Sequence, residues 1–235
     1  MLSSLGSNSD AMIQAVIFDL DGVIADTVEL YYIATKRIAD EIGVPFDRRL
    51  NQQLQGMSRQ AMVEALLGEK AGEWTKEEKV KLGERRGMYY RELIEQLTPH
   101  NILPGMYSLL QHIRNDGVPV ALASSSSNAF TVVERLGVRS FFDVIVDVKT
   151  ITQLKPNPEI FLTAANELGV DPRDCIAIED GEAGIQAIKQ AGMFSVGIGK
   201  HLAPLSPDWL VERTEQVTWE QLKRMFLKKR TTPLM

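Results

Sequence analysis

Short apolar segments rich in β-branched residues recur along this chain, and segments with helical periodicity separate most of them. The apolar segments cover residues 13–18, 118–123, 144–146, 175–178 and 195–198. Runs of this length and composition are typical of strands that are buried on both faces. Strands that alternate with helices form a parallel sheet, because each crossover helix returns the chain to the same edge. The sequence therefore predicts an α/β core.

Residues 29–101 follow a different pattern, in which apolar residues recur at helical spacing and charged residues occupy the positions between them. Examples are Tyr32, Ile33, Ile38 and Ile42, and later Met62, Val63, Leu66 and Leu67. Asp26-Thr27 and Leu103-Pro104-Gly105 mark the two edges, and we expect Asp26 and Thr27 to act as a hinge. The predicted fold is α/β, a Rossmann-like, three-layer parallel-sheet core with an inserted all-helical cap.

The predicted domains follow from these edges. The core comprises residues 12–28 and 102–222, and the cap comprises residues 29–101. Residues 223–235 are interpreted as the end of a last helix and a tail. Residues 1–11 are rich in Ser, Gly and Asn, and we interpret them as a disordered tail or a remnant of cloning.

The bulk composition limits the partners and the compartment. The 235 residues are 44% apolar and carry a formal net charge of −5, which suits a globular protein but not a general nucleic-acid or membrane-binding surface. The only cysteine, Cys175, lies in an apolar run and is interpreted as a buried strand residue. No apolar stretch approaches the ~20 residues of a membrane span. We expect a cytoplasmic monomer that acts on a small molecule.

Acidic residues follow two of the predicted strands. Asp19 and Asp21 come directly after the first strand, and Glu179 and Asp180 end the fourth. Ligands bind at the carboxyl ends of parallel strands. Oxygen ligands from two strand ends suit Mg²⁺ better than zinc. The alternatives are solvated loop acids and, for the second pair, acids that cap the helix beginning near Glu182.

Ser124 follows the second strand, and Lys155 lies in a Lys-Pro turn. A hydroxyl, the backbone amides before the helix at Asn128 and an ammonium group would form a cradle for a phosphoryl group, to which Ser125 could contribute. The alternative is a simple polar turn and a surface cation.

The order of these motifs resembles the haloacid dehalogenase superfamily. The matching motifs are Asp19-x-Asp21-Gly22 with Asp26-Thr27, Ala123-Ser124, Lys155-Pro156 and Glu179-Asp180. The resemblance implies that Asp19 is a nucleophile that forms an aspartyl phosphate and that Asp21 is the general acid/base. It also implies a Mg²⁺ ion held by Asp19, Asp21, Glu179 and Asp180, with Lys155 and Ser124 on the transferring phosphate.

Within that superfamily the chain is most similar to the β-phosphoglucomutase-like family. The resemblance rests on the segment from Leu54 to Arg59, on the serine run before Asn128 and on residues 179–188. It implies that cap and loop residues hold the part of the sugar phosphate that is not transferred. These residues are Gly56, Met57, Ser58, Arg59, Arg86, Ser126 and Asn128.

The chain departs from that family at four positions. Tyr31 and Thr35 replace a usual His and Trp, and Gln55 and Ser127 replace usual cations. The expected activity is conversion of β-glucose 1-phosphate to glucose 6-phosphate through the 1,6-bisphosphate, and the alternative is hydrolysis of small sugar phosphates. A phospho-accepting signalling module is a third reading, but it needs neither Asp21 nor a helical cap.

Overall fold

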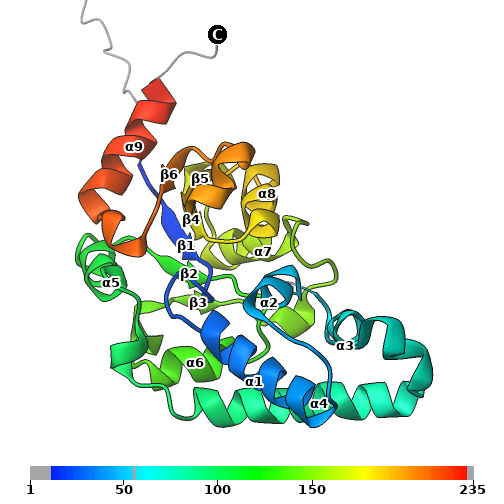
Figure 1. Ribbon diagram of the computed structural model, residues 1–235. Coiled ribbons are helices and arrows are strands. Elements are labelled where there is room, and N and C mark those ends of the chain that lie inside the picture. The colour runs from blue at the N-terminus through cyan, green and yellow to red at the C-terminus, as the bar shows by residue number, and fades with distance from the viewer. Residues whose placement is uncertain (1–11, 55–56, 232–235) are drawn as a thin grey trace, which may run out of the picture.

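In the part of the chain that the structure describes, six short strands form one parallel sheet in the order β3-β2-β1-β4-β5-β6 (Figure 1). The computed structural model describes residues 12–54 and 57–231. Its strands are β1 (Ala15–Phe18), β2 (Val120–Leu122), β3 (Val144–Ile145), β4 (Cys175–Glu179), β5 (Phe194–Ile198) and β6 (Trp209–Val211). In the register of the central strands, Phe18 lies opposite both Leu122 and Ile178. The carboxyl ends of β1, β2 and β4 are therefore level with one another.

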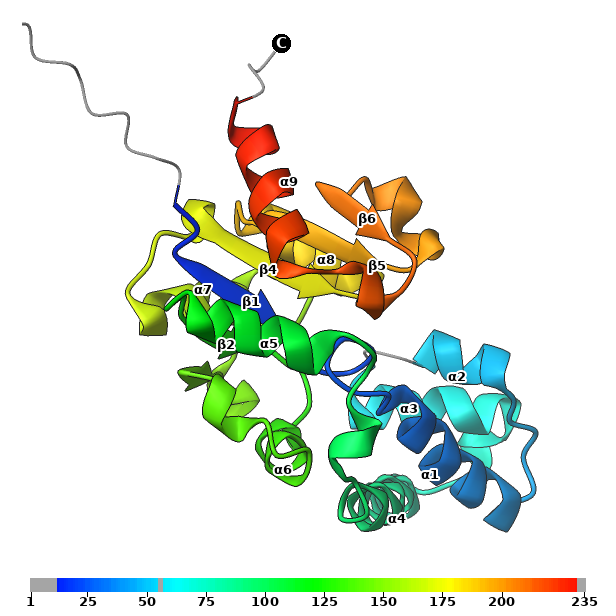
Figure 2. The same ribbon diagram turned by 90° about the vertical axis from the view of Figure 1, so that its left-hand side faces the viewer.

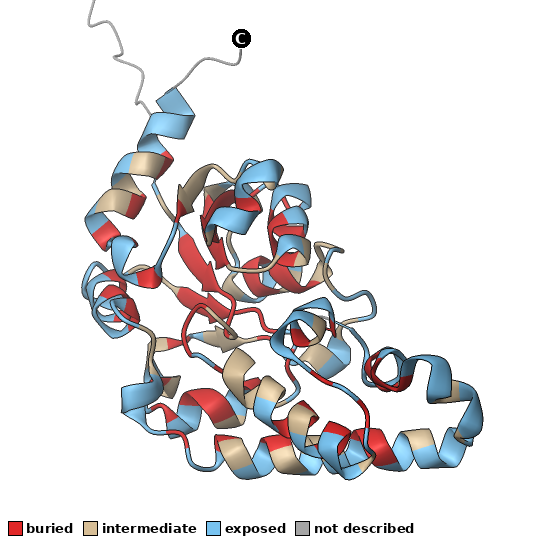
Figure 3. Cartoon of the chain, in the orientation of Figure 1, coloured by how far each residue is buried: buried red, intermediate tan, exposed pale blue. Residues whose placement is uncertain are grey.

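Helices cover both faces of this sheet (Figures 1 and 2). The core helices are α5 (Met106–Asn115), α6 (Ala129–Arg135), α7 (Glu159–Leu168), α8 (Glu182–Gln190) and α9 (Trp219–Thr231). Because side chains alternate along a strand, Val16 and Phe18 pack with α5, α6 and α9, whereas Ala15 and Ile17 pack with α7 and α8. Figure 3 shows the central strands buried and the outer faces of the helices exposed. The predicted three-layer α/β fold is confirmed.

The segment between β1 and α5 is helical and has a core of its own. Its helices are α1 (Val28–Glu41), α2 (Arg48–Leu54), α3 (Arg59–Leu67) and α4 (Lys76–Ile94). Buried residues such as Ile38, Val63 and Leu82 form a separate apolar cluster among them. Thr75 and Glu78 cap α4 reciprocally, with hydrogen bonds of 3.2 and 2.8 Å. We call this helical segment the cap.

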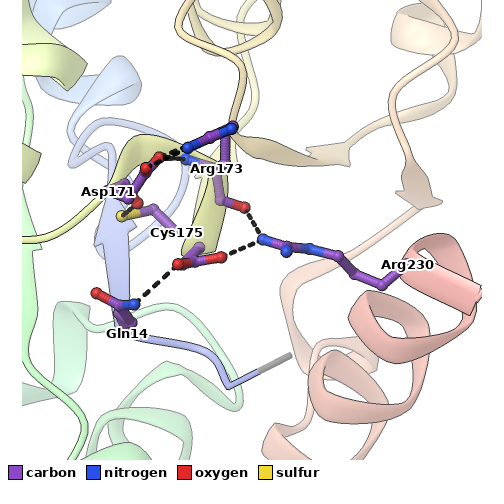
Figure 4. Close-up of polar contacts among 6 residues, drawn as sticks. Gln14, Asp171, Arg173, Cys175 and Arg230 are labelled. Carbon is purple, nitrogen blue, oxygen red and sulfur yellow. Dashed lines mark hydrogen bonds and ion pairs between the residues drawn. The ribbon is translucent and has the colours of Figure 1, made fainter. Parts of the chain in front are cut away.

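The last helix, α9, contacts the loop at the amino end of the sheet (Figure 4). Arg230 in α9 donates to the carbonyl oxygen of Arg173 at 2.5 Å and pairs with the Asp174 carboxylate. The same carboxylate accepts a hydrogen bond of 2.8 Å from the Gln14 side chain, just before β1. Cys175 follows directly and is fully buried in β4, as the sequence predicts; burial raises the pKa of its thiol to about 12.

Two elements differ from the prediction. The strand β6 was not predicted, because Trp209-Leu210-Val211 is only three residues long and lies at the sheet edge, where burial is incomplete. The second strand is shorter than its apolar run and begins at Val120, after Pro119, which has no N–H to donate to the sheet. Across residues 12–54 and 57–231, no helix combines the length and apolar character needed to cross a membrane.

Candidate active site

The strand ends bring together side chains that lie far apart in the sequence. Lys155, in the loop before α7, donates hydrogen bonds to Asp19 Oδ1 at 2.7 Å and to Glu179 Oε2 at 2.8 Å. The three side chains are 10%, 8% and 4% exposed, respectively. Burial alone would lower the pKa of Lys155, but the Asp19 and Glu179 carboxylates outweigh burial and raise it. Lys155 therefore stays charged at neutral pH.

Asp19, Glu179 and Asp180 form an all-oxygen cluster. Each of the three offers one carboxylate oxygen, and these oxygens lie within 4.8 Å of one another. Burial and the charge of Glu179 raise the pKa values of Asp19 and Asp180 well above the ordinary 3.8. Buried carboxylates that repel one another in this way fit a hard divalent cation, since its charge offsets theirs and it prefers oxygen ligands.

Glu179 is held from two sides. Its Oε1 atom accepts hydrogen bonds from the amides of Asp180 at 3.0 Å and Gly181 at 2.9 Å, while Oε2 accepts from Lys155. A Cβ atom on Gly184 would lie 1.8 Å from Oε2. The glycine therefore provides the space that the Glu179 carboxylate fills. Sequence reasoning missed this role of Gly184, for which an interior helix glycine was the only signal.

A second glycine allows the loop after β1 to approach β4. Gly22 has a φ of +76°, and a Cβ atom there would lie 1.9 Å from Asp180 Oδ2. Its amide donates to the carbonyl oxygen of Ala25 at 2.8 Å, which closes the turn after Asp21. The sequence analysis placed Gly22 in the Asp19-x-Asp21-Gly22 motif but did not predict its close approach to Asp180.

Asp21 and the predicted hinge lie in this turn. The hydroxyl of Thr27 donates to Asp21 Oδ1. Burial raises the pKa of Asp21, and the hydrogen bond from Thr27 acts in the opposite direction. Asp26 is exposed at the start of α1, whereas Thr27 is buried. The second crossing between core and cap runs alongside, because the amide of Leu103 donates to the carbonyl oxygen of Ile24 at 2.8 Å.

The serine loop after β2 is ordered by its own hydroxyls. Ser124 is buried, and its Oγ accepts from the amide of Ser126 at 3.0 Å; Ser126 Oγ accepts from the amide of Asn128 at 3.2 Å. These serines thus satisfy two of the backbone amides in the predicted cradle. The side chains of Ser125 and Ser127 are exposed, so the structure does not bring them into the buried cluster.

The structure brings only some of the cap residues that were predicted to bind the substrate close to one another. Arg59 begins α3 and lies against α4, where a Cβ atom on Gly83 would lie 2.9 Å from Arg59 Cγ. Met57 is exposed, and the Ser58 hydroxyl accepts from the amide of Ala61 at 3.2 Å as the N-cap of α3. Gln55 and Gly56 lie outside the described residues.

Arg86 lies in a cluster at the junction of cap and core. Its Nε donates to the hydroxyl of Thr35 at 3.2 Å, and its guanidinium lies 4.7 Å from the centre of the Tyr31 ring. Burial lowers the pKa of Arg86, and the charge of Arg59 acts in the same direction. The Tyr31 hydroxyl donates to Ser126 Oγ at 3.2 Å, which links α1 to the serine loop.

Tyr90 in α4 completes this cluster, and sequence reasoning missed it. Its ring stacks on Tyr31 with a centroid distance of 4.1 Å and an angle of 12°. Tyr90 is 1% exposed, and among the described residues its hydroxyl has no hydrogen-bond partner. An unsatisfied buried hydroxyl costs ~1–3 kcal/mol. The only sequence signal was an aromatic residue at helical spacing, which usually indicates core packing.

A cavity of about 310 Å³ opens between cap and core beside Asp180. Its walls come from α1, from α2 and from the core loops that carry Asp180 and His201. The lining residues are Val28, Glu29, Arg48, Asn51, Gln52, Asp180 and His201. A small molecule in this cavity would have direct access to the acidic cluster.

Residues 13–192 match the profile of the haloacid dehalogenase-like hydrolases. Together with the sheet topology and the acidic strand ends, this match shows that the chain belongs to the haloacid dehalogenase-like family. Within that family it is a β-phosphoglucomutase homologue. It is 47% identical to a β-phosphoglucomutase from Bacillus subtilis over 211 residues, which cover 89% of this chain and 93% of the relative.

Two further relatives show the range of the family. A crystal structure of a β-phosphoglucomutase from Clostridium difficile superimposes with a TM-score of 0.87 and 39% identity, over 94% of this chain and 100% of that chain. A phosphorylated carbohydrates phosphatase from Thermotoga maritima is 30% identical over 186 residues, which cover 77% of this chain and 82% of the relative. The relatives thus include both isomerases and phosphatases.

Proposed function

We propose that this protein is a Mg²⁺-dependent β-phosphoglucomutase, which converts β-glucose 1-phosphate to glucose 6-phosphate through β-glucose 1,6-bisphosphate. The observation that carries the chemistry is the buried Asp19–Lys155–Glu179 arrangement beside Asp21 and Asp180. The choice of reaction within the family rests on the 47% identity to the Bacillus subtilis enzyme.

The transfer begins with attack by an Asp19 carboxylate oxygen on phosphorus. The bond from phosphorus to the sugar oxygen breaks, an aspartyl phosphate forms, and Asp21 gives its proton to the leaving oxygen. In the reverse direction Asp21 takes the proton from the accepting hydroxyl. Because burial raises the pKa of Asp21, its protonated form persists to higher pH than in a solvated carboxyl. One acid can therefore serve both half-reactions.

The remaining core residues bind and orient the phosphoryl group. Mg²⁺, when bound to Asp19, Asp180, Glu179 and the Asp21 carbonyl, would offset the repulsion between nucleophile and phosphate. In this proposal, Lys155 and the Ser124 hydroxyl hold the equatorial oxygens of the phosphoryl group. The buried strand ends keep water away from Asp19 once the cap is closed.

The second phosphate of the bisphosphate belongs, in this proposal, to the cap and the serine loop. Arg59 and Arg86 supply positive charge, and Ser126 and Asn128 supply polar contacts. Ser58 and Met57 would shape the loop that precedes α3. The hinge at Asp26-Thr27 lets these groups approach and leave the core.

A specific observation favours a phosphatase as the second candidate. Ser127, at a position where the family usually carries a cation, is exposed and neutral. The Thermotoga maritima relative is a phosphatase of phosphorylated carbohydrates. A weaker hold on the distal phosphate would leave water as the acceptor from the aspartyl phosphate.

Product analysis separates the two candidates. Purified protein with Mg²⁺, β-glucose 1-phosphate and a trace of β-glucose 1,6-bisphosphate should yield glucose 6-phosphate much faster than inorganic phosphate. Inorganic phosphate that appears at the rate of substrate loss would show that water is the usual acceptor, and the phosphatase assignment would then replace the mutase.

A cap variant tests the distal-phosphate site. Arg59→Ala should impair use of the sugar bisphosphate far more than hydrolysis of a small aryl phosphate, because only the bisphosphate presents a second phosphate. Arg85→Ala is the charge-matched control, since Arg85 is exposed on α4 and pairs with Glu41 at 3.2 Å. Equal losses on both substrates in the Arg59 variant would remove Arg59 from the site.

A further inference from the structure

The cap presents to the core a cluster of hydrogen-bond donors that is only partly satisfied. Tyr90 and Arg86 lie one turn apart on α4, and Tyr31 faces them from α1, which lies beside α4 in both views (Figures 1 and 2). Arg86 donates one hydrogen bond, to Thr35, and no carboxylate of the described chain lies at ion-pair distance from it. The Tyr90 hydroxyl makes no hydrogen bond of 3.5 Å or less there, and the Tyr31 hydroxyl, which influences its pKa, donates to Ser126 instead.

This cluster lies next to the serine loop, which is part of the proposed phosphate site. The Tyr31 hydroxyl touches Ser126 in the serine loop. Burial raises the pKa values of Tyr31 and Tyr90 most, and the negative charge of Asp21 raises them further, so both phenols lie within the electric field of the proposed acid/base. A buried hydroxyl without a partner, on a ring whose centre lies 6.0 Å from the Arg86 guanidinium, is suited to donate a hydrogen bond to an oxygen of a bound anionic substrate.

We infer that the Tyr90 hydroxyl is a substrate ligand, which donates a hydrogen bond to an oxygen of the sugar phosphate held between Asp21 and Ser126. Tyr31 keeps the Tyr90 ring in place by stacking, and Arg86 adds the positive charge that an anionic substrate requires. This inference rests on the proposed sugar-phosphate chemistry but not on which acceptor completes the reaction. A purely structural Tyr90 would gain nothing from its hydroxyl.

The test uses Tyr90→Phe, which removes only that hydroxyl. In the Mg²⁺-loaded protein, kcat/KM for consumption of β-glucose 1-phosphate should fall about tenfold, which corresponds to about 1.4 kcal/mol. The thermal midpoint of the ligand-free variant should equal or exceed that of the wild type, because an unpaired buried hydroxyl is lost. A fall in activity without a fall in stability distinguishes a substrate contact from a structural one.

Tyr89→Phe is the matched control. Tyr89 is the neighbouring residue on α4, and its hydroxyl donates to Glu41 on the surface of the cap. Its removal should leave kcat/KM within twofold of the wild type and should not raise the thermal midpoint. If Tyr90→Phe also stays within twofold in kcat/KM, or if it lowers the midpoint by several degrees, the inference is wrong.

A binding measurement separates this inference from the proposed function. Asp19→Asn protein should hold β-glucose 1,6-bisphosphate without turnover, so calorimetry can compare it with the Asp19→Asn, Tyr90→Phe double variant. We expect the dissociation constant to rise about tenfold in the double variant, whether the active protein makes glucose 6-phosphate or inorganic phosphate. Equal dissociation constants would overturn the role of Tyr90 and leave the mutase assignment untouched.

Discussion

Replacing Lys155 by Met should destabilise the folded protein, because the active site contains buried carboxylates that Lys155 neutralises. The Met side chain is similar in length to that of Lys, but it is uncharged. It therefore leaves Asp19 and Glu179 buried without their shared cation. Removing one partner of a buried ion pair typically destabilises a protein by ~3–5 kcal/mol. In a chain of this size, each kcal/mol shifts the thermal midpoint by roughly 2–4 °C. We therefore expect a fall of roughly 6–20 °C at neutral pH.

The loss of stability in the Lys155→Met variant should depend on pH. Burial raises the pKa of Asp19 in the folded protein above the ordinary 3.8, and loss of Lys155 would raise it further. A raised pKa contributes stability that is present at low pH and is lost as the pH rises through the folded-state pKa. The defect of Lys155→Met should thus be largest at neutral pH and should shrink near pH 4, where the carboxyl is protonated.

Thermal unfolding monitored by circular dichroism, at a series of pH values with and without Mg²⁺, measures this difference. Added Mg²⁺ should stabilise the variant more than the wild type, because the cation replaces part of the missing positive charge. A variant that unfolds within 1 kcal/mol of the wild type at neutral pH, or whose defect grows toward pH 4, would refute the buried charge network.

Four further changes test the remaining parts of the site. Asp19→Asn should abolish turnover and aspartyl phosphate formation while circular dichroism stays native; substantial residual turnover would contradict a nucleophilic Asp19. Thr27→Val removes the hydrogen bond that lowers the pKa of Asp21, so the alkaline limb of kcat/KM should move to higher pH; a downward shift would be incompatible with Asp21 as the acid. Gly184→Ala should cost ~1–3 kcal/mol in urea unfolding through displacement of Glu179, whereas Gly72→Ala, with open space around it, should not. A chelator should stop activity and Ca²⁺ should inhibit it, because its larger, looser shell misplaces the attacking oxygen; full activity in chelator would exclude the metal site.

The sequence was informative where local pattern and chain order decide the structure. The apolar runs that stop at Asp19 and at Glu179-Asp180 predicted strand ends, and the parallel register then placed these acids level with one another. The change to helical spacing after Asp26 predicted the cap for the same reason. Both predictions depend on periodicity, which a single sequence contains.

Features that depend on distant contacts were not predictable from the sequence. The ion pairs of Lys155 join residues that are 136 and 24 positions apart. The space beside Gly184 and the unpaired hydroxyl of Tyr90 exist only because other side chains pack around them. Gly56, to which the family resemblance assigned a substrate role, lies outside the described residues, as does Gln55, where the chain departs from the family. Ser58 showed a different limit, because a serine before a helix serves equally as an N-cap.

The polar contacts that Asp174 makes with Arg230 and Gln14 have a practical consequence for handling the protein. They fix the first and last described segments at the amino end of the sheet (Figure 4). Asp19 and Glu179 lie at the opposite, carboxyl ends of β1 and β4. A surface anchor or a fluorescent label attached at Met12 or Thr231 would therefore lie at the end of the sheet that is remote from the acidic cluster. Single-molecule or immobilised-enzyme experiments could use such attachments to test whether the cap moves about the proposed hinge at Asp26-Thr27.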